Sequence, residues 1–210
     1  MREIRWITEV EALAENVDAM IFDLDDTLYL ERDYVKSGYA AVAREFPQIP
    51  RMEEKLWEAF LSGGRAIDQV LTDAGMASEE HCAKALRIYR FHTPNIQLLS
   101  GAEDLLLRLR KAGKKLGIIT DGRPEGQRAK LEALGLYDLV DEIIVTDELG
   151  GVEFRKPNEV AFRLMQQRLN VPFARMMYVG DNLKKDFIAP DALGMQTCYH
   201  RVSDGLYTQI

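Results

Sequence analysis

The chain has 210 residues, of which 47% are hydrophobic and 29% are charged, and its formal net charge is −7. This length suits one compact domain, or one domain that carries a smaller insertion. The negative charge argues against binding to long nucleic acids, because their phosphate backbones attract basic proteins. A small anionic substrate stays open, since a few local cations and a metal ion decide whether it binds.

The sequence shows no targeting or membrane-spanning segment. The N-terminal region is charged throughout, and no later stretch approaches the ~20 apolar residues that a membrane-spanning helix needs. Cys82 and Cys198 are far apart in the sequence and lack the spacing of a metal site, so two unpaired thiols are expected. We therefore expect a soluble, cytoplasmic protein that is a monomer or a small homo-oligomer.

The first predicted strand is the apolar run 19–22. After it, residues 31–94 contain helical stretches and no convincing strand, which indicates a helical domain inserted into a larger one. The larger domain then comprises residues 1–30 and 95–210. The helical stretches of the insertion cover residues 34–46, 52–64 and 78–91.

Beyond the insertion, short apolar runs alternate with amphipathic helical patterns. The runs predict buried strands, and the helical patterns have apolar residues at i, i+3, i+4 and i+7 or begin with a proline. Such alternation predicts an α/β fold, in which a Rossmann-like parallel sheet carries helices on both faces. The predicted strands cover 115–119, 142–145 and 176–179, and the predicted helices cover 101–113, 124–135 and 157–170.

Three aspartates, Asp23, Asp25 and Asp26, fall directly after the first predicted strand. Parallel sheets bind ligands beyond the carboxyl ends of their strands, which is where these side chains are expected. Alternate positions on an extended chain point the same way, so Asp23 and Asp25 face one spot and repel unless a cation or proton intervenes. An isolated pair of this kind would more simply open a turn or cap a helix, so the downstream segments decide between the two interpretations.

The segment 118–122 places Thr120 and Asp121 at the end of the next strand, with Gly122 just ahead of a helix. Backbone N–H groups at such a position point at an anion, so Thr120, Asp121 and Gly122 form a candidate phosphate cradle. Taken alone, the segment is equally consistent with a simple strand-to-helix turn.

Three further polar residues complete the set. Lys156 precedes the proline that opens the helix 157–170, and Asp181 follows the strand 176–179, with Asp186 about one helical turn later. Each is weak evidence by itself. With the earlier segments, however, they supply a nucleophile, a proton donor, groups for the phosphoryl oxygens and carboxylates for a hard cation. Phosphoryl transfer requires these parts.

In this order, the segments FDLDDTL, ITDG, RKP and GDNLKKD resemble the four motifs of the haloacid dehalogenase superfamily. The resemblance covers nearly the whole chain outside the helical insertion. The insertion lies between the first and second motifs, where that superfamily carries a helical cap of the C1 type. One departure is the tripeptide TDG at 120–122, where many relatives have TNG or SNG.

By this resemblance, Asp23 attacks phosphorus to form an aspartyl-phosphate, and Asp25 protonates the leaving oxygen and then activates water. Dehalogenases of the superfamily lack an acid two residues after the nucleophile, so Asp25 favours a phosphomonoesterase. A neighbouring carboxylate is expected to raise the pKa of Asp25. The resemblance also implies Mg²⁺, held by the Asp23 carboxylate, the backbone carbonyl of Asp25 and Asp181.

The remaining roles are implied in the same way. Thr120 is expected to bind a phosphoryl oxygen, and Lys156 to neutralise the transferring group and keep Asp23 ionised. Asp186 is expected beside the metal, behind its ligands or on a metal-bound water. Two arginines are candidate substrate contacts: Arg65, in a turn of the insertion, and Arg123, directly after the second motif. An exposed arginine after a helix-ending glycine pair is an equally good interpretation of Arg65.

Two alternatives stay open. A phosphomutase uses the same aspartyl-phosphate and passes the phosphoryl group to a sugar hydroxyl. A non-catalytic binding protein on this fold is disfavoured, because Asp23 and Asp25 are both retained. The expected substrate is a small phosphorylated metabolite, and the sequence does not decide between a sugar phosphate, a nucleotide and a short organic phosphate.

Overall fold

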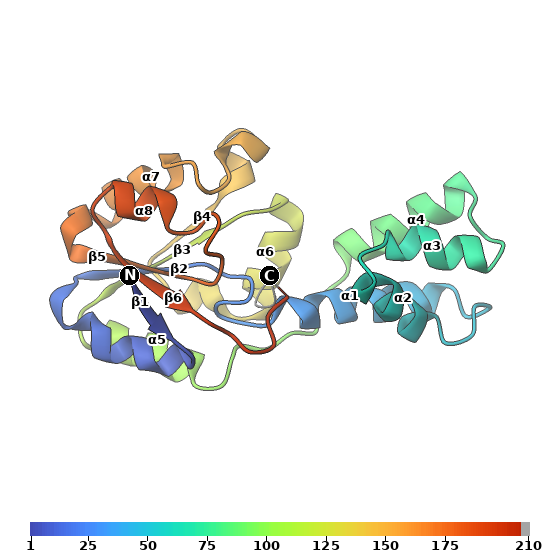
Figure 1. The fold of residues 1–210 in the computed structure, drawn as a ribbon, viewed down its shortest axis with the longest axis horizontal. Helices are drawn as coiled ribbons and strands as arrows, with labels where there is room; N and C mark the ends of the chain where they lie inside the picture. Colours follow the sequence, from blue (N-terminus) through green and yellow to red (C-terminus); the bar gives the residue numbers. More distant parts are fainter. Residues whose placement is uncertain (207–210) are drawn as a thin grey trace. The chain divides into compact units, whose positions relative to one another are not determined.

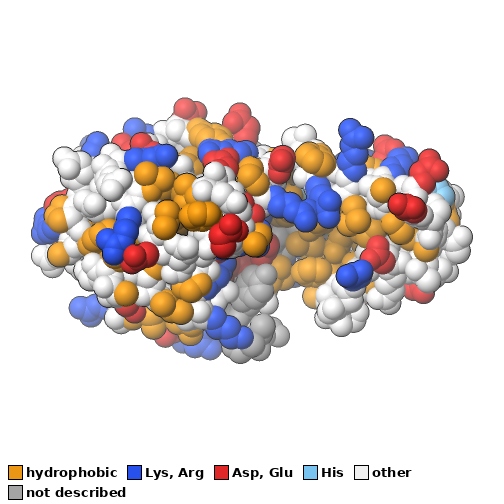
Figure 2. All heavy atoms as spheres, turned by 90° about the horizontal axis from the view of Figure 1, so that it is seen from above, with side chains coloured by type: hydrophobic (Ala, Val, Ile, Leu, Met, Phe, Trp, Pro, Cys, Tyr) orange, Lys and Arg blue, Asp and Glu red, His pale blue; other side chains and the backbone are white. Residues whose placement is uncertain are grey.

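The computed structural model describes residues 1–206, and the chain divides into two units (Figure 1). The sheet unit comprises Met1–Glu31 and the described residues from Gln97 onward, and the helical unit comprises Arg32–Ile96. Each unit is described by itself. Charged side chains of both signs are interspersed on the face of each unit that Figure 2 shows.

The sheet unit contains a six-stranded sheet in the order β1-β6-β5-β2-β3-β4, and all neighbouring strands pair in parallel. This confirms the predicted parallel sheet and its four predicted strands. The strands β1 and β6 were not predicted, because β1 has three residues and β6 mixes polar and apolar side chains. The strands are β1 Arg2–Ile4, β2 Ala19–Phe22, β3 Lys115–Thr120, β4 Glu142–Val145, β5 Met176–Gly180 and β6 Gln196–His200.

The direction in which successive strands are added reverses at β2. The strands β3 and β4 are added on one side of β2, whereas β5 and β6 lie on its other side. At such a reversal the connections leave the strand ends in opposite directions and open a crevice beyond their carboxyl ends. Residues that directly follow β2, β3 and β5 are therefore placed around one crevice.

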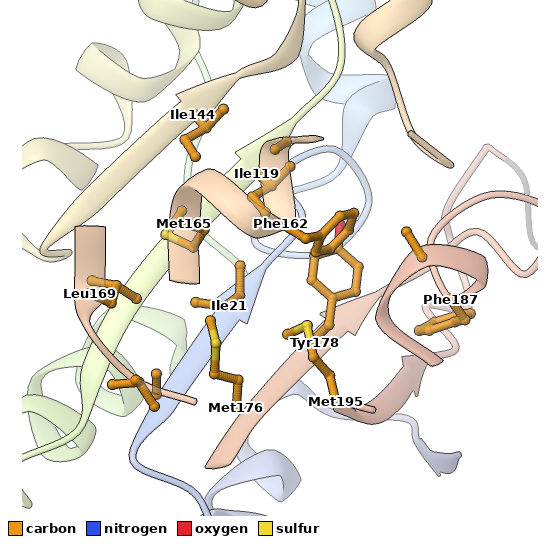
Figure 3. Close-up of a cluster of buried hydrophobic side chains, with 14 residues drawn as sticks. Ile21, Ile119, Ile144, Phe162, Met165, Leu169, Met176, Tyr178, Phe187 and Met195 are labelled. Atoms are coloured by element: carbon orange, nitrogen blue, oxygen red, sulfur yellow. The ribbon is translucent and has the colours of Figure 1, made fainter. Parts of the chain in front are cut away.

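Helices cover both faces of the sheet, as predicted (Figure 1). The helix α5 (Ala102–Lys111) and the 3₁₀ segment η1 (Ile7–Asn16) lie against one face, and α7 (Val160–Leu169) and α8 (Ile188–Ala192) against the other. Successive strand residues point to opposite faces. Ile21 thus packs under Phe162 and Met165 of α7 (Figure 3), while Phe22 points away from that cluster. The predicted helices at 101–113, 124–135 and 157–170 correspond to α5, α6 (Pro124–Ala133) and α7.

The helical unit contains four helices in its described residues. They are α1 Glu31–Glu45, whose first residue belongs to the sheet unit, α2 Met52–Leu61, α3 Ala66–Asp73 and α4 Glu79–Phe91. The helix α3 was not predicted, although Ile67, Val70 and Leu71 form a buried face on it. Gly38, inside α1, makes room for α4, because a Cβ atom there would lie 2.6 Å from the ring of Tyr89. Within residues 1–206, no helix has the length and apolar composition that crossing a membrane requires.

Candidate active site

A cleft of about 530 Å³ lies within the sheet unit, beyond the carboxyl ends of β2, β3 and β5. Its lining contains five carboxylates and also four cations, so charged groups dominate it. Each of these cations is ion-paired with a carboxylate of the same unit. The cations are Lys130, Arg155, Lys156 and Lys185.

Asp23 continues the line of β2 into this cleft. Its backbone N–H donates a 2.8 Å hydrogen bond to the carbonyl of Val179 in β5, which fixes the carboxylate at the sheet edge. The side chain is buried, and its Oδ1 lies 2.7 Å from Nζ of Lys156. Burial raises the pKa of Asp23 to about 7, against the attraction of Lys156 and with the repulsion of Asp186. Removal from water is therefore the main reason why the Asp23 carboxylate binds a proton more tightly than usual in the free site.

Lys156 is fully buried and joins three groups. Besides Asp23, its Nζ lies 2.9 Å from Oδ1 of Asp186 and donates a 2.9 Å hydrogen bond to the hydroxyl of Tyr178. Burial alone lowers the pKa of this ammonium, but Asp186 and Asp23 outweigh burial and raise it well above its usual value. The attraction of Lys156 lowers the pKa of Asp23 but does not outweigh burial, so the expectation that Lys156 keeps Asp23 ionised stays a prediction.

Asp186 is held from both sides of its carboxylate. Its Oδ2 accepts a 2.9 Å hydrogen bond from the backbone N–H of Asn182, whereas Oδ1 faces Lys156 outside hydrogen-bonding direction. The bond to Oδ2 folds the loop after β5 back on the strand end. Gly180 permits this fold, because a Cβ atom there would lie 2.5 Å from Oδ2 of Asp186.

We therefore expect Gly180→Ala to displace Asp186 and disturb Lys156. Overpacking of this kind typically costs about 1–3 kcal/mol of unfolding free energy, and a shift of about 1 Å at a catalytic group can lower turnover about 100-fold. Chemical denaturation and phosphate-release assays measure the two effects. Unchanged stability together with unchanged turnover would show that the contact with Asp186 is dispensable.

The residues present fit a hard divalent cation. Carboxylate oxygens of Asp23, Asp181 and Asp186 lie within 4.8 Å of one another, and all three side chains are buried. Burial, together with the charges of Asp23 and Asp186, raises the pKa of Asp181 to about 9. Three buried carboxylates clustered in this way suit Mg²⁺, which prefers oxygen ligands and retains several waters.

Asp25 lines the same cleft but is held differently from Asp23. Its Oδ1 accepts hydrogen bonds from the hydroxyl of Tyr29 and from Nζ of Lys130 (2.6 Å), and its Oδ2 accepts one from the amide of Gln127 (2.9 Å). Burial raises the pKa of Asp25, but Lys130, Tyr29 and Gln127 outweigh burial and hold that pKa below its usual value. The expectation that a neighbouring carboxylate raises the pKa of Asp25 is therefore wrong for the free site, because the nearest charge is a cation.

Asp121 and Gly122 line the same cleft, whereas Thr120 is fully buried and is not among the lining residues found within residues 1–206. Contact of Thr120 with a phosphoryl oxygen therefore stays a prediction. Oδ1 of Asp121 accepts hydrogen bonds from Thr146 and from the backbone N–H of Lys156, and Oδ2 is 2.9 Å from Nζ of Lys185. Burial raises the pKa of Asp121, yet Lys156 and Lys185 outweigh it and lower the pKa. The carboxylate of Asp121 thus braces the loops around the cleft. Any phosphate contact from this residue falls to its backbone.

The two candidate arginines are not part of this cluster of contacts. Arg123 is exposed at the N-terminal end of α6 and is not among the residues found to line the cleft in the described part of the chain. Arg65 belongs to the helical unit, where it lines a separate hollow with Tyr39 and Tyr89 and lies 3.8 Å from Asp68. Contact of either arginine with substrate stays a prediction.

Four residues that hold the named ones in place were not predicted: Gln127, Lys130 and Lys185, which line the cleft, and the buried Tyr29. Gln127 and Lys130 are buried polar residues three positions apart on α6. That spacing places both on one face of the helix. This spacing was the only sequence feature that could have indicated the roles of Gln127 and Lys130, and polar residues on many exposed helix faces have the same spacing.

A family model described as haloacid dehalogenase-like hydrolase matches residues 17–194, which include every residue of the Asp23 and Asp25 contacts described above. The chain belongs to the haloacid dehalogenase-like hydrolase family. Membership confirms the resemblance seen in the four motifs and the prediction of a hydrolase.

Proteins that are similar to this chain in sequence include named phosphatases, in agreement with the predicted class of phosphoric monoester hydrolase. The chain is 35% identical to the glyceraldehyde 3-phosphate phosphatase of Pyrococcus abyssi, over 88% of this chain and 82% of that protein. It is 27% identical to the pyrimidine 5′-nucleotidase YjjG of Escherichia coli, over 87% and 85% of the two chains. Among solved structures, the HAD-hydrolase YfnB of Bacillus subtilis, bound to magnesium, matches with a TM-score of 0.63 and 21% identity over 88% and 87% of the chains. This last likeness supports the fold.

Proposed function

We propose that this family member is a magnesium-dependent phosphomonoesterase that hydrolyses a small phosphorylated metabolite through an aspartyl-phosphate. The proposal rests chiefly on one observation: the buried Asp23 carboxylate lies 2.7 Å from Lys156 and beside Asp181 and Asp186, with Asp25 two residues on. Relatives named as phosphatases of glyceraldehyde 3-phosphate and of pyrimidine nucleotides support the substrate class.

The proposed reaction has two steps, formation of the aspartyl-phosphate and its hydrolysis. A carboxylate oxygen of Asp23 attacks phosphorus, the bond from phosphorus to the ester oxygen breaks, and that oxygen leaves as an alcohol with the proton of the Asp25 carboxyl group. A water molecule then attacks phosphorus, gives its proton to Asp25, and releases inorganic phosphate and the Asp23 carboxylate. A dianionic phosphate beside Asp25 favours its protonated form, so the acid role requires bound substrate even though Lys130 lowers the pKa in the free site.

Other residues bind and orient the transferring group. We expect the hydroxyl of Thr120, at the end of β3, and the backbone at Asp121 and Gly122 to donate hydrogen bonds to phosphoryl oxygens, and Lys156 to offset their charge. Asp23, Asp181 and the backbone carbonyl of Asp25 would hold Mg²⁺, with Asp186 beside them. When bound, the ion supplies positive charge that stabilises the charge on the transferring phosphoryl group.

Metal removal should abolish turnover. We expect treatment with EDTA to stop phosphate release and added Mg²⁺ to restore it, because three buried carboxylates otherwise repel the substrate. A second readout is independent of activity. Mg²⁺ at about 100 times its dissociation constant should raise the unfolding free energy by about 2.7 kcal/mol. Turnover that is unaffected by EDTA, in a protein that Mg²⁺ does not stabilise, would contradict the metal assignment.

A panel of phosphate monoesters tests the function directly. Purified protein with Mg²⁺ should release phosphate from one class of ester, whether sugar phosphates, nucleoside monophosphates or smaller organic phosphates. A phosphomutase would instead retain the phosphoryl group until an acceptor sugar is present. An aspartyl-phosphate that discharges to water without acceptor therefore supports the phosphatase, and one that waits for the sugar supports the mutase.

A further inference from the structure

Gln127 is a buried residue of α6 whose side-chain amide lies between two groups of the site. Its Nε2 donates one hydrogen bond to Oδ2 of Asp25 (2.9 Å) and one to Oγ1 of Thr120. An amide nitrogen carries two protons, so these two bonds use both of them. A carboxylate can only accept, which means that the NH₂ end of Gln127 must face Asp25.

The bond to Thr120 determines what the hydroxyl can do. Thr120 is fully buried at the end of β3, and its oxygen accepts from Gln127. A hydroxyl that accepts at its oxygen keeps its own proton for another acceptor. The bond from Gln127 therefore leaves the Thr120 hydroxyl able to donate its proton, which is the role that binding a phosphoryl oxygen requires.

The two carboxylate oxygens of Asp25 have different hydrogen-bond partners. Oδ1 accepts from Tyr29 and Lys130, whereas Oδ2 accepts one hydrogen bond, from Gln127, among those found within residues 1–206. A carboxylate oxygen has two acceptor positions. Oδ2 thus retains a position for the proton that passes to the leaving oxygen and returns from water.

Gly122 leaves room for this amide. A Cβ atom at Gly122 would lie 3.2 Å from Cγ and Cδ of Gln127, and the residue has a φ of +140°, which side chains rarely adopt. The loop that is expected to cradle phosphate therefore packs directly on Gln127. The side chain of Gln127 thus lies beside Gly122, Thr120 and Asp25 together.

We propose that Gln127 is a positioning residue that sets the distance between Oδ2 of Asp25 and the hydroxyl of Thr120, and so places the proton beside the leaving oxygen of bound substrate. The inference rests on the proposed phosphatase function and deepens it. Precise placement of an acid matters most for esters whose leaving group is a poor one. Hydrolysis of alkyl phosphates, such as phosphorylated sugars and polyols, should therefore depend on Gln127 more strongly than hydrolysis of aryl phosphates.

The test compares two esters that differ in their need for an acid. Glycerol phosphate releases an alkoxide that must be protonated, whereas 2,4-dinitrophenyl phosphate releases a phenolate that leaves without a proton. The quantity measured is kcat/KM, which reports the steps up to the first irreversible one. The variants are Gln127→Met, which removes both hydrogen bonds, and the isosteric Gln127→Glu, which cannot donate them as a carboxylate. Glu132→Gln, on an exposed position of α6, is the matched control.

We expect kcat/KM for glycerol phosphate to fall about 100-fold in both Gln127 variants. The value for the aryl ester should fall only about threefold, through the lost support of Thr120. The control should match the wild type on both esters. A merely structural role would lower both values by the same factor and overturn the inference, as would a Gln127 variant with wild-type values. If Gln127→Met does not fold, Gln127→Glu decides alone.

Two outcomes for the wild-type protein separate this inference from the function on which it rests. A wild-type protein that cleaves the aryl ester but no alkyl phosphate overturns the inference and leaves a phosphatase. A wild-type protein that cleaves neither ester, nor any member of the phosphate panel, overturns the proposed function itself.

Discussion

Asp23→Asn should lower phosphate release by about 10⁴-fold or more, because the amide cannot form the aspartyl-phosphate. The fold should persist. Lys156 keeps its ion pair with Asp186, and loss of one carboxylate relieves repulsion with Asp181, so the unfolding free energy should change by about 1 kcal/mol at most. Phosphate release and chemical denaturation measure the two quantities.

The matched control for this variant is Asp138→Asn, which makes the same chemical change at an exposed residue of the sheet unit. The control should retain wild-type turnover. Residual turnover of the Asp23→Asn protein within about tenfold of the wild type would sink the nucleophile assignment, because removal of a covalent nucleophile costs far more. Unfolding of the variant would instead assign Asp23 a structural role that its contacts do not predict.

The sequence alone could predict Asp23 and Asp181 because each directly follows a strand, and strand ends of a parallel sheet meet. Lys156 follows no strand directly, and it was predicted from its place in the order of the four motifs. It could not predict which groups touch Asp25. Lys130 reaches Asp25 from 105 positions away, and nothing in either local pattern encodes that contact. The direction of the Asp25 pKa follows from this contact, so the sequence-based expectation was wrong.

The same distinction between local and distant information applies to the fold. The helices α5, α6 and α7 have capping and periodicity signals within their own residues, and they were predicted. The strand β1 pairs with β6, from the opposite end of the chain, and neither strand has the continuous apolar run of a central strand. Edge strands such as β1 depend on their partner, which sequence periodicity does not reveal.

Asp121 shows how a residue type can be explained only by its neighbours. The sequence places an aspartate where many relatives have asparagine, and a second anion facing a phosphate is unfavourable. In the structure, Lys185 and the N–H of Lys156 compensate that carboxylate, and it joins the second and third motifs. Its contribution is therefore to hold Lys156 in position.

Lys156→Met should lower both the unfolding free energy and the rate of turnover. The methionine fills a similar space but leaves Asp23 and Asp186 buried without their cation. Breaking a buried ion pair by removing one partner typically costs about 3–5 kcal/mol of unfolding free energy. Turnover should fall by about 100-fold or more, since a charge that stabilises the transferring phosphoryl group is lost.

Magnesium distinguishes this electrostatic explanation from simple loss of packing. Without the ammonium, Asp23, Asp181 and Asp186 carry a larger uncompensated charge and should bind Mg²⁺ more tightly. Denaturation of Lys156→Met should therefore respond to Mg²⁺ more strongly than that of the wild type, whereas the exposed Lys184→Met should behave as the wild type does. An equal response of all three proteins would mean that Lys156 acts through packing, and that its charge does not balance the carboxylates of the site.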